Sequence, residues 1–435
     1  MEEVVVVGSG ISGLSTAYRL KKQGVRVVVY EKDDEIGGNI KTLRVNGYII
    51  EVGPQTVLAD EDVLSFFREL GLRPVEASPS SKKRYILKRG KLFPVPLNPV
   101  SFLTSPLLSV RGKLRVLKEI FLPAGSGEES LADFVRRRLG EEVLTYLVQP
   151  FVSGVYAGDP EALSVKYAFP RLYALEREFG SLIKGAMKKR SLAPKGKLVS
   201  FEGGLKTLTD RLAEEVEVRK ENVVLRIRRK DDRFILDTRS GKVETKAVVV
   251  SSPAYTASYL LKDLSWSAAK EFDSIDYPPV AVVNVGVRSG SVPDGFGFLV
   301  PRVEGRRILG VIFTSRIFKG RAPEGRDLLT VYLGGATDRG IADMGEEEIA
   351  EVVERDLREI LGVSDVEIIK VKVWKRAIPQ YTVGYGKYLN LAREMEDTFP
   401  GLFLTGNYLS GISVPDCIRY SKKVAEKVVR YLEGS

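Results

Sequence analysis

The stretch Val4-Val5-Val6-Val7-Gly8-Ser9-Gly10-Ile11-Ser12-Gly13, at the start of the chain, decides the fold. Its four consecutive valines are typical of a strand buried on both faces. Glycines follow at once, and residues 11–23 then carry apolar side chains at helical spacing until Gly24. A second apolar run, 25–30, ends at Glu31. These residues therefore predict a strand, a glycine-rich turn, a helix and a second strand.

Each glycine of this turn has a physical task if the turn binds a dinucleotide. Gly8 permits the sharp turn out of the strand, Gly10 lets a pyrophosphate approach the backbone, and Gly13 lets the helix pack close to the sheet. The start of the helix offers free N–H groups to phosphates. Glu31 can accept hydrogen bonds from ribose hydroxyls and repels a 2′-phosphate. A glycine-rich turn without a ligand is the alternative that this context disfavours.

NAD and FAD share such an opening, and the segments that follow distinguish them. Gly37-Gly38-Asn39 comes a few residues after Glu31, and Gly53-Pro54-Gln55 comes after a further apolar run. Turns of this kind let the backbone curve over a longer dinucleotide. The sequence therefore favours FAD.

Composition limits the chemistry and the partners. The 435 residues include one cysteine, Cys417, and no histidine, which excludes histidine-based triads and histidine metal sites. This composition leaves a reaction whose difficult chemistry a cofactor can carry, and we expect no bound metal. No apolar run is long enough to span a membrane, and the N-terminus does not resemble a secretory signal, so we expect a cytoplasmic protein. The net charge of +10 suits an anionic partner such as nucleic acid, an acidic membrane surface or a polycarboxylate.

The two ends of the chain resemble each other in organisation. Residues 402–405 predict a strand, which a glycine-containing turn and a helix over 415–432 follow. One domain built from both ends is therefore expected. Alternating apolar strands over 280–335 predict a sheet in a second domain, and 128–150 reads as helical. The predicted class is α/β (α+β overall), with a Rossmann-type FAD-binding domain (1–78, 198–262 and 398–435), a helical and possibly membrane-binding domain (79–197), and a mixed-sheet substrate domain (263–397) to whose pocket 150–197 contribute.

Several segments resemble one known family. The spacing from Glu31 to Gly37-Gly38 is similar to that of the flavin amine oxidase superfamily. Within it, the chain resembles the protoporphyrinogen and coproporphyrinogen oxidase family. The segments that carry this resemblance are spread over the chain: Gly53-Pro54-Gln55, 150–160 (PFVSGVYAGDP), 176–182 (EREFGSL), 203–205 (GGL), 295–301 (GFGFLVP), 377–381 (AIPQY) and 406–417 (GNYLSGISVPDC).

The resemblance implies a non-covalently bound FAD and names its contacts. Those on the ADP side would be Gly8, Ser9, Gly10, Ile11, Ser12, Gly13, Glu31, Lys32 and Val224. Those towards the flavin would be Gly38, Asn39, Gly53, Pro54, Gln55, Thr56, Trp374, Gly411, Ile412, Ser413 and Val414. For Trp374, ordinary packing in the core is the alternative.

The resemblance also implies a substrate, a porphyrinogen oxidised to a porphyrin in three two-electron steps, with molecular oxygen or another acceptor reoxidising the flavin. Protoporphyrinogen IX is the expected substrate, and coproporphyrinogen III stays open. Because the flavin carries the chemistry, no catalytic side chain is assigned. Eukaryotic relatives place an arginine for a substrate propionate where this chain has Leu58. Propionate recognition must therefore use another cation, for which the 166–184 segment offers candidates, or less contact. The expected pocket consists of Gly154, Phe296, Gly297, Leu299, Leu309 and Tyr332, each of which could equally be a core residue.

Within 92–122, the residues Val110, Leu114, Leu117 and Phe121 fall on one helical face with basic residues around them. Relatives attach to one membrane leaflet through this region, which implies peripheral attachment to the inner face of the cell membrane. A helix packed on the FAD domain is the alternative. We expect no nucleic-acid partner, and the oligomeric state is open.

Two other functions compete. The first is another flavin oxidase, such as an amine oxidase or a carotenoid desaturase, which the SGVYAGDP segment at 153–160 disfavours. The second is a flavin-dependent isomerase or an FAD-binding protein without redox activity, which anaerobic addition of a porphyrinogen would distinguish by the absence of flavin bleaching.

Overall fold

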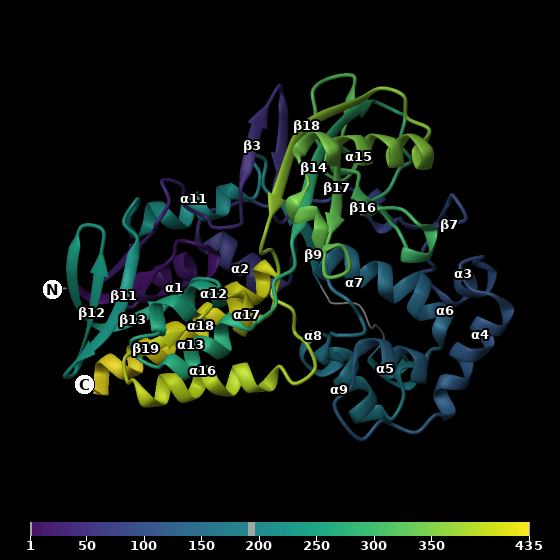
Figure 1. Cartoon of the computed structure of the whole chain (residues 1–435). Helices are drawn as coiled ribbons and strands as arrows, with labels where there is room; N and C mark the ends of the chain where they lie inside the picture. Colours follow the sequence, from purple (N-terminus) through teal and green to yellow (C-terminus); the bar gives the residue numbers. More distant parts are fainter. Residues whose placement is uncertain (1, 190–195, 435) are drawn as a thin grey trace.

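The computed structural model describes residues 2–189 and 196–434. Two seven-stranded sheets dominate the described chain, and a group of helices lies beside the second sheet (Figure 1). The predicted α/β class is confirmed. Residues 190–195, which the expected helical domain includes, lie outside the described residues.

Strands from both ends of the chain form the first sheet. Parallel pairing joins β1 to β2 and β13, and β13 to β19, while β11 and β12 extend the sheet antiparallel. The strands are β1 (Glu2–Val7), β2 (Val27–Tyr30), β10 (Glu217–Arg219), β11 (Val224–Lys230), β12 (Arg233–Thr238), β13 (Gly241–Val250) and β19 (Leu402–Leu404).

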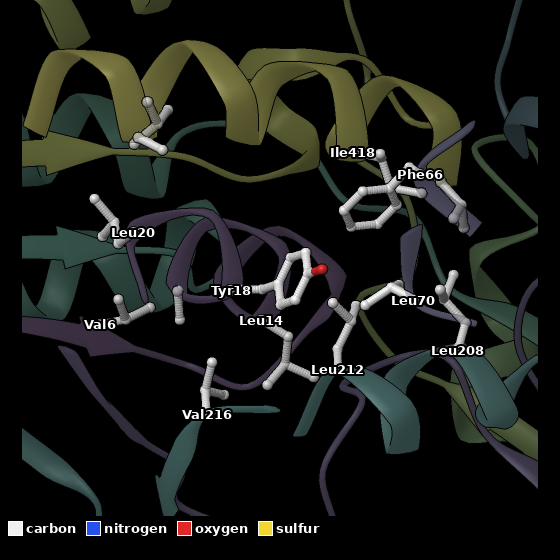
Figure 2. Close-up of a cluster of buried hydrophobic side chains, with 14 of the residues drawn as sticks. Val6, Leu14, Tyr18, Leu20, Phe66, Leu70, Leu208, Leu212, Val216 and Ile418 are labelled. Atoms are coloured by element: carbon white, nitrogen blue, oxygen red, sulfur yellow. The ribbon is translucent and has the colours of Figure 1, made fainter. Parts of the chain in front are cut away.

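Helices cover both faces of this sheet, which explains its continuous apolar runs. Val4 and Val6 face one helical layer, and Val5 and Val7 face the other. Figure 2 shows the first layer, where Leu14 and Tyr18 lie among side chains that include Leu212. The first layer contains α1 (Ile11–Lys22), α2 (Glu61–Glu69), α11 (Lys206–Glu215) and α18 (Val414–Gly434), and the second contains α12 (Ala254–Leu261), α13 (Trp266–Asp273) and α16 (Gly386–Thr398).

The second sheet is mixed, in the order β18-β14-β17-β16-β15-β7-β8. Helix α15 (Glu346–Leu361) covers one face, where Val283, Phe298 and Val331 form a core with Leu357. Residues that alternate with these point to the other face. The strands are β7 (Arg84–Lys88), β8 (Lys91–Pro94), β14 (Val280–Arg288), β15 (Gly297–Leu299), β16 (Ile308–Ile312), β17 (Arg326–Gly334) and β18 (Val366–Trp374).

Two placements differ from the expected organisation. Residues 84–94, expected in the helical domain, form the hairpin β7–β8 because its first strand pairs with the distant β15. Helices α13 and α16, expected in the substrate domain, pack on the first sheet. Both differences depend on contacts between segments far apart in the chain, and local patterns do not reveal such contacts.

The helical group has its own apolar core, with a buried ion pair beside it. Arg138 is fully buried and pairs with Glu119 and Glu176. No helix within residues 2–189 and 196–434 is long and apolar enough to cross a membrane. The helices of this group are α3 (Pro99–Thr104), α4 (Val110–Leu117), α5 (Leu131–Arg138), α6 (Glu141–Val143), α7 (Gln149–Tyr156), α8 (Val165–Ala168), α9 (Pro170–Phe179) and α10 (Leu182–Lys189).

Short strands connect these parts. The hairpin of β3 (Thr42–Val45) and β4 (Tyr48–Glu51) precedes the Gly53 turn. A three-stranded sheet contains β5 (Val57–Ala59), β6 (Val75–Glu76) and β9 (Lys197–Ser200). The short helix α17 (Asn407–Ser410) lies between β19 and α18.

Candidate functional site

The glycine turn lies between β1 and α1, at the carboxyl edge of the first sheet. Gly8 has φ +103°, which favours glycine. A Cβ on Gly13 would lie 2.1 Å from the Gly8 carbonyl oxygen, so only glycine allows this packing of helix and sheet. A Cβ on Gly10 would have no described atom within 4 Å. Gly13 therefore serves the fold, whereas Gly10 leaves space in front of the turn.

Glu31 follows β2 directly and lies beside the glycine turn. One carboxylate oxygen accepts hydrogen bonds from the Ser9 N–H at 2.8 Å and the Ser9 hydroxyl at 2.6 Å, and the other accepts from the Asp33 N–H at 3.0 Å. These bonds hold the carboxylate in place and leave further lone pairs for a ligand. Lys32, in contrast, is exposed and pairs with Asp33.

The other residues predicted on the ADP side are close in space. The Asn222 N–H donates to the Glu31 carbonyl at 2.8 Å, and this contact brings the start of β11, with Val224, beside the end of β2. Ile11 and Ser12 form the first turn of α1. The N-cap position is Gly10, which has no side chain, so no side-chain hydrogen bond caps this helix. An uncapped helix start beside an open glycine suits a phosphate group.

The second glycine pair folds back over the first turn. The Gly37 N–H donates to the Ser9 carbonyl at 2.9 Å, and a Cβ on Gly38 would lie 3.2 Å from the Cα of Gly10. Behind this pair, a Cβ on Gly53 would lie 1.9 Å from the Asn39 carbonyl oxygen. The structure thus brings Gly38 and Asn39 together with the segment 53–56.

The turn at Gly411 closes the site from the other end of the chain. Gly411 has φ +105°, and its N–H donates to the Tyr381 hydroxyl at 2.9 Å. Ser413 caps α18 by accepting from the Asp416 N–H at 3.2 Å. The buried Cys417 thiol contacts Ser12, and burial raises its pKa. This contact brings the turn 411–414 close to the start of α1.

These residues fit a dinucleotide that lies across the carboxyl edge of the sheet. Open space at Gly10, an uncapped helix start and a fixed carboxylate at Glu31 are the features that its pyrophosphate and ribose require. The model of the flavin-containing amine oxidoreductases matches residues 11–429. The chain belongs to this family. It is an FAD-dependent oxidoreductase, and the expected FAD cofactor is confirmed.

Individual relatives of this flavoenzyme cover almost its whole length. Protoporphyrinogen oxidase 1, chloroplastic, from Spinacia oleracea is 38% identical, and the match covers 99% of this chain and 84% of that protein. Coproporphyrinogen III oxidase from Bacillus subtilis (strain 168) is 30% identical, with 99% and 98% covered. A solved structure from Exiguobacterium sp. 255-15, named as a candidate protoporphyrinogen oxidase, is 27% identical with a TM-score of 0.86, and the match covers 99% of each chain.

Most of the residues predicted to bind substrate lie on the face of the second sheet that α15 does not cover. A Cβ on Gly154 of α7 would lie 2.4 Å from Leu299 Cδ2 and 3.9 Å from the Leu309 carbonyl oxygen. Leu309 occupies a register shift between Ile308 and Gly310, so its backbone approaches α7. A Cβ on Gly297 would lie 1.9 Å from the Val311 carbonyl oxygen, so this glycine is explained by strand pairing alone.

Gln55 joins the segment predicted to meet the cofactor to the sheet face predicted to bind substrate. Its amide nitrogen donates to the Glu51 carbonyl at 3.0 Å, and its amide oxygen accepts from the Thr330 hydroxyl at 3.2 Å. Gln55 also hydrogen-bonds the hydroxyl of Tyr332, whose pKa burial raises well above its usual value. Tyr332 is the register partner of Gly310 and therefore shares the face with Leu299.

The position of Trp374 is explained by packing. Its indole N–H donates to the Val52 carbonyl at 2.6 Å, and its ring packs in clusters with Tyr48 and Val280. This bond ties β18 to the segment just before Gly53. A contact between Trp374 and the flavin stays a prediction, as do the other ligand contacts expected from the sequence.

Sequence reasoning assigned no role to two groups near the site. Glu51 is almost fully buried, and its carboxylate accepts from the Leu205 N–H at 2.8 Å and the Thr42 hydroxyl at 2.7 Å. Burial raises the pKa of Glu51 to about 7. The sequence did contain a signal for Glu51, because this glutamate ends an apolar strand, Tyr48–Glu51. Arg84 is the second group and had no local signal, because only the pairing of β7 brings it to the site.

Proposed function

We propose that this flavoenzyme oxidises a porphyrinogen to a porphyrin, with protoporphyrinogen IX as the substrate in haem biosynthesis. The observation that carries the proposal is the close approach of α7 to the sheet face at Gly154, where only a glycine leaves room for Leu299. A flat macrocycle needs such a wall, with backbone close on one side. The names of the relatives from spinach and B. subtilis support the same substrate class.

The proposed reaction removes six electrons in three two-electron steps. FAD, when bound, accepts a hydride from the macrocycle in each step. The chain's own residues then have to position the macrocycle and exclude water. Gly154 admits the ring edge, and Leu299 with Phe296 supplies apolar surface. The raised pKa of Tyr332 keeps its phenol protonated, so it can donate a hydrogen bond and does not serve as a base.

Anaerobic reduction tests this function. Adding protoporphyrinogen IX to the oxidised holoenzyme without oxygen is expected to bleach the flavin absorbance near 450 nm (a general property of flavins) as porphyrin fluorescence rises. A primary amine serves as the comparison substrate. Bleaching by the amine and not by the porphyrinogen would instead assign the chain to the amine oxidases.

Coproporphyrinogen III is the second candidate substrate, because the B. subtilis relative matches over nearly the full length of both chains. The two porphyrinogens differ in vinyl against propionate groups at two positions. The ratio of their kcat/KM values decides between them, and a value at least about tenfold higher for protoporphyrinogen is expected.

Molecular oxygen is the proposed acceptor. Six hydrogen atoms leave each macrocycle, so three molecules of oxygen are reduced to three of hydrogen peroxide for each porphyrin formed. Measuring peroxide against porphyrin checks this balance. Turnover that needs an added quinone, with no peroxide formed, would point to another acceptor.

A membrane surface is the proposed partner of the helical group. The α3–α4 patch, which we define by its exposed apolar side chains, lies at the outer end of the molecule (Figure 1). Val110 is 74% exposed and Phe121 is 86% exposed, whereas a helix packed on the first sheet would bury this side. Arg111 and Lys118 are exposed beside it. The patch consists of Leu97, Val100, Leu103, Val110, Leu114, Leu117 and Phe121.

Sedimentation with vesicles tests this attachment. The wild-type protein is expected to co-sediment with anionic vesicles at low salt and to be released as salt rises, because surface charges are screened. Leu114→Ser with Phe121→Ser is expected to abolish most of the binding. Trp266→Ser is the matched control, since Trp266 is 73% exposed on α13, outside the patch. Equal binding by all three proteins would contradict the proposal.

A further inference from the structure

The segment 377–384 leads from β18 to α16 and connects the helical group with the turn before α18. On one side it pairs antiparallel with 162–164, where the Ser164 N–H donates to the Tyr381 carbonyl at 2.8 Å. Two polar side chains of this segment, Gln380 and Tyr381, are buried. One short stretch of chain therefore reaches both the helical group and the first sheet's site.

The hydroxyl of Tyr381 holds the turn before α18. It donates to the Asn407 carbonyl at 2.7 Å and accepts from the Gly411 N–H at 2.9 Å. One oxygen thus bonds both ends of α17, and it fixes the backbone at Gly411, whose φ of +105° favours glycine. Burial raises the pKa of Tyr381 well above its usual value, so the hydroxyl keeps the proton that it donates.

Gln380 makes a corresponding contact with α7. Its side-chain nitrogen donates to the Tyr156 carbonyl at 2.9 Å. Tyr156 is the last residue of α7, and the carbonyls of a last helical turn have no partner inside the helix. The fit is close, because a Cβ on Gly158 would lie 2.7 Å from the Gln380 side-chain oxygen. Gln380 therefore fixes the end of the helix that carries Gly154.

We propose that Gln380 and Tyr381 are positioning residues, which hold α7 and the turn 411–414 at the separation that hydride transfer requires. The proposal rests on the porphyrinogen function proposed above and on the place predicted for 411–414 beside the flavin. Reacting atoms must lie about 3–3.5 Å apart, and a misplacement of about 1 Å can cost about a hundredfold in rate. Two adjacent residues that bond both partners limit such a displacement, without contact to flavin or substrate.

Tyr381→Phe tests the flavin side. It removes the hydroxyl and keeps the ring, whose centre lies 4.2 Å from that of Tyr385 in a stacked pair. We expect the holoenzyme variant to retain its flavin, with a shifted flavin absorbance spectrum and midpoint potential. Its kcat should fall roughly tenfold, with KM for protoporphyrinogen nearly unchanged, because the change acts on geometry and leaves the substrate contacts in place.

Tyr385→Phe is the matched control. The Tyr385 hydroxyl is buried in the same stacked pair and donates to the neighbouring carbonyl of α17, that of Tyr408, at 2.9 Å. Its loss should lower the thermal stability by about as much as Tyr381→Phe does. The flavin spectrum, the midpoint potential and kcat should stay at their wild-type values, because the bond to the Gly411 N–H remains.

Gln380→Leu tests the substrate side. It removes the donor to α7 and should slow anaerobic reduction of the flavin by protoporphyrinogen roughly tenfold. Reduction by dithionite and the flavin spectrum should not change. Gln149→Leu is the control, because Gln149 begins the same helix and its side chain bonds Ser153 and the Arg302 N–H, both at 2.8 Å. This variant should keep the wild-type rate of reduction by protoporphyrinogen.

The outcomes separate the proposal from the function beneath it. A Tyr381→Phe enzyme with the same flavin spectrum and kcat as Tyr385→Phe would overturn the role of Tyr381. A Gln380→Leu enzyme that protoporphyrinogen reduces as fast as Gln149→Leu would overturn the role of Gln380. Both results leave the porphyrinogen function intact. A wild-type enzyme that no porphyrinogen reduces would overturn the function, while the spectrum and potential of Tyr381→Phe would still test its hold on the turn.

Discussion

The two large sheets use opposite ways of making a site. The first sheet offers its carboxyl edge, where the Gly8–Gly13 turn and Glu31 come from neighbouring parts of one strand–helix–strand unit. The second sheet carries the proposed substrate site on a face, where Gly154, Leu299 and Tyr332 come from three distant segments. A site at an edge can therefore be recognised in a short motif, whereas a site on a face depends on register and on what packs against it.

The largest effect is expected where the edge site meets the cofactor. Gly10→Val should weaken FAD binding about a hundredfold or more, because the side chain fills the space that the pyrophosphate needs. The fold should persist, since no described atom lies within 4 Å of a Cβ at Gly10. The measurement is flavin content after dialysis together with circular dichroism. Gly127→Val, another position with open space, is the control and should keep its flavin.

A substitution at the proposed substrate site on the second sheet should have a different effect from one at the cofactor site. Gly154→Ala places a methyl group 2.4 Å from Leu299 Cδ2, a flexible side-chain end. We expect full flavin content and a KM for porphyrinogen roughly tenfold higher, because pocket space is lost and the cofactor site is untouched. Adding Leu299→Ala should restore much of the KM. A loss of flavin in Gly154→Ala would show that edge and face are not independent.

A smaller effect is expected when the charge of Glu31, at the carboxyl edge of the first sheet, is removed. Glu31→Gln keeps the shape and removes the carboxylate that accepts from Ser9 and that is predicted to bind the ribose. We expect FAD to bind about tenfold more weakly, in line with about 1.5 kcal/mol for a hydrogen bond to a charged group. Titration of the apoprotein with FAD measures the change. Lys242→Gln, at an exposed position near the start of β13, should leave affinity within about twofold. Equal losses in both variants would contradict the role of Glu31.

The smallest effect is expected for Glu51, whose carboxylate lies behind the segment that joins the cofactor site to the proposed substrate site. Burial raises the pKa of Glu51 from 4.5 to about 7, so its proton is held more tightly in the folded chain than in the unfolded chain. Its contribution to stability is therefore present below pH 4.5 and is lost as pH rises towards 7. Glu51→Gln should remove this pH dependence, so the stability of the variant should fall less than that of wild type between pH 5 and pH 8.

Thermal unfolding at pH 5 and pH 8 tests this linkage. The difference between Glu51→Gln and wild type should be larger at pH 8 than at pH 5. The exposed Glu394→Gln on α16 is the control and should show no such change. If Glu51→Gln destabilised the protein equally at both values, the carboxylate would be charged in the folded state throughout the range.

The comparison of the two sheets also explains which predictions succeeded. The first strand, helix and second strand were predictable because each pattern is local: a valine run, a glycine turn and a helical repeat. The same holds for α18, which the sequence predicts over 415–432 and the structure places at Val414–Gly434. The hairpin of β7 and β8 was not predictable as part of the second sheet, because its partner β15 lies about two hundred residues further along the chain.

The sequence by itself determined a dinucleotide site and the α/β class, because glycines at Gly8, Gly10 and Gly13 act through their own backbone and through the helix they begin. The turns at Gly37-Gly38 and Gly53 then favoured FAD. It also determined the family, through segments spread along the chain. Only the tertiary structure decided what faces the second sheet's site. Gly154 meets Leu299 and Gln55 meets Tyr332, because strand register and packing between distant segments bring side chains together and no short pattern records that.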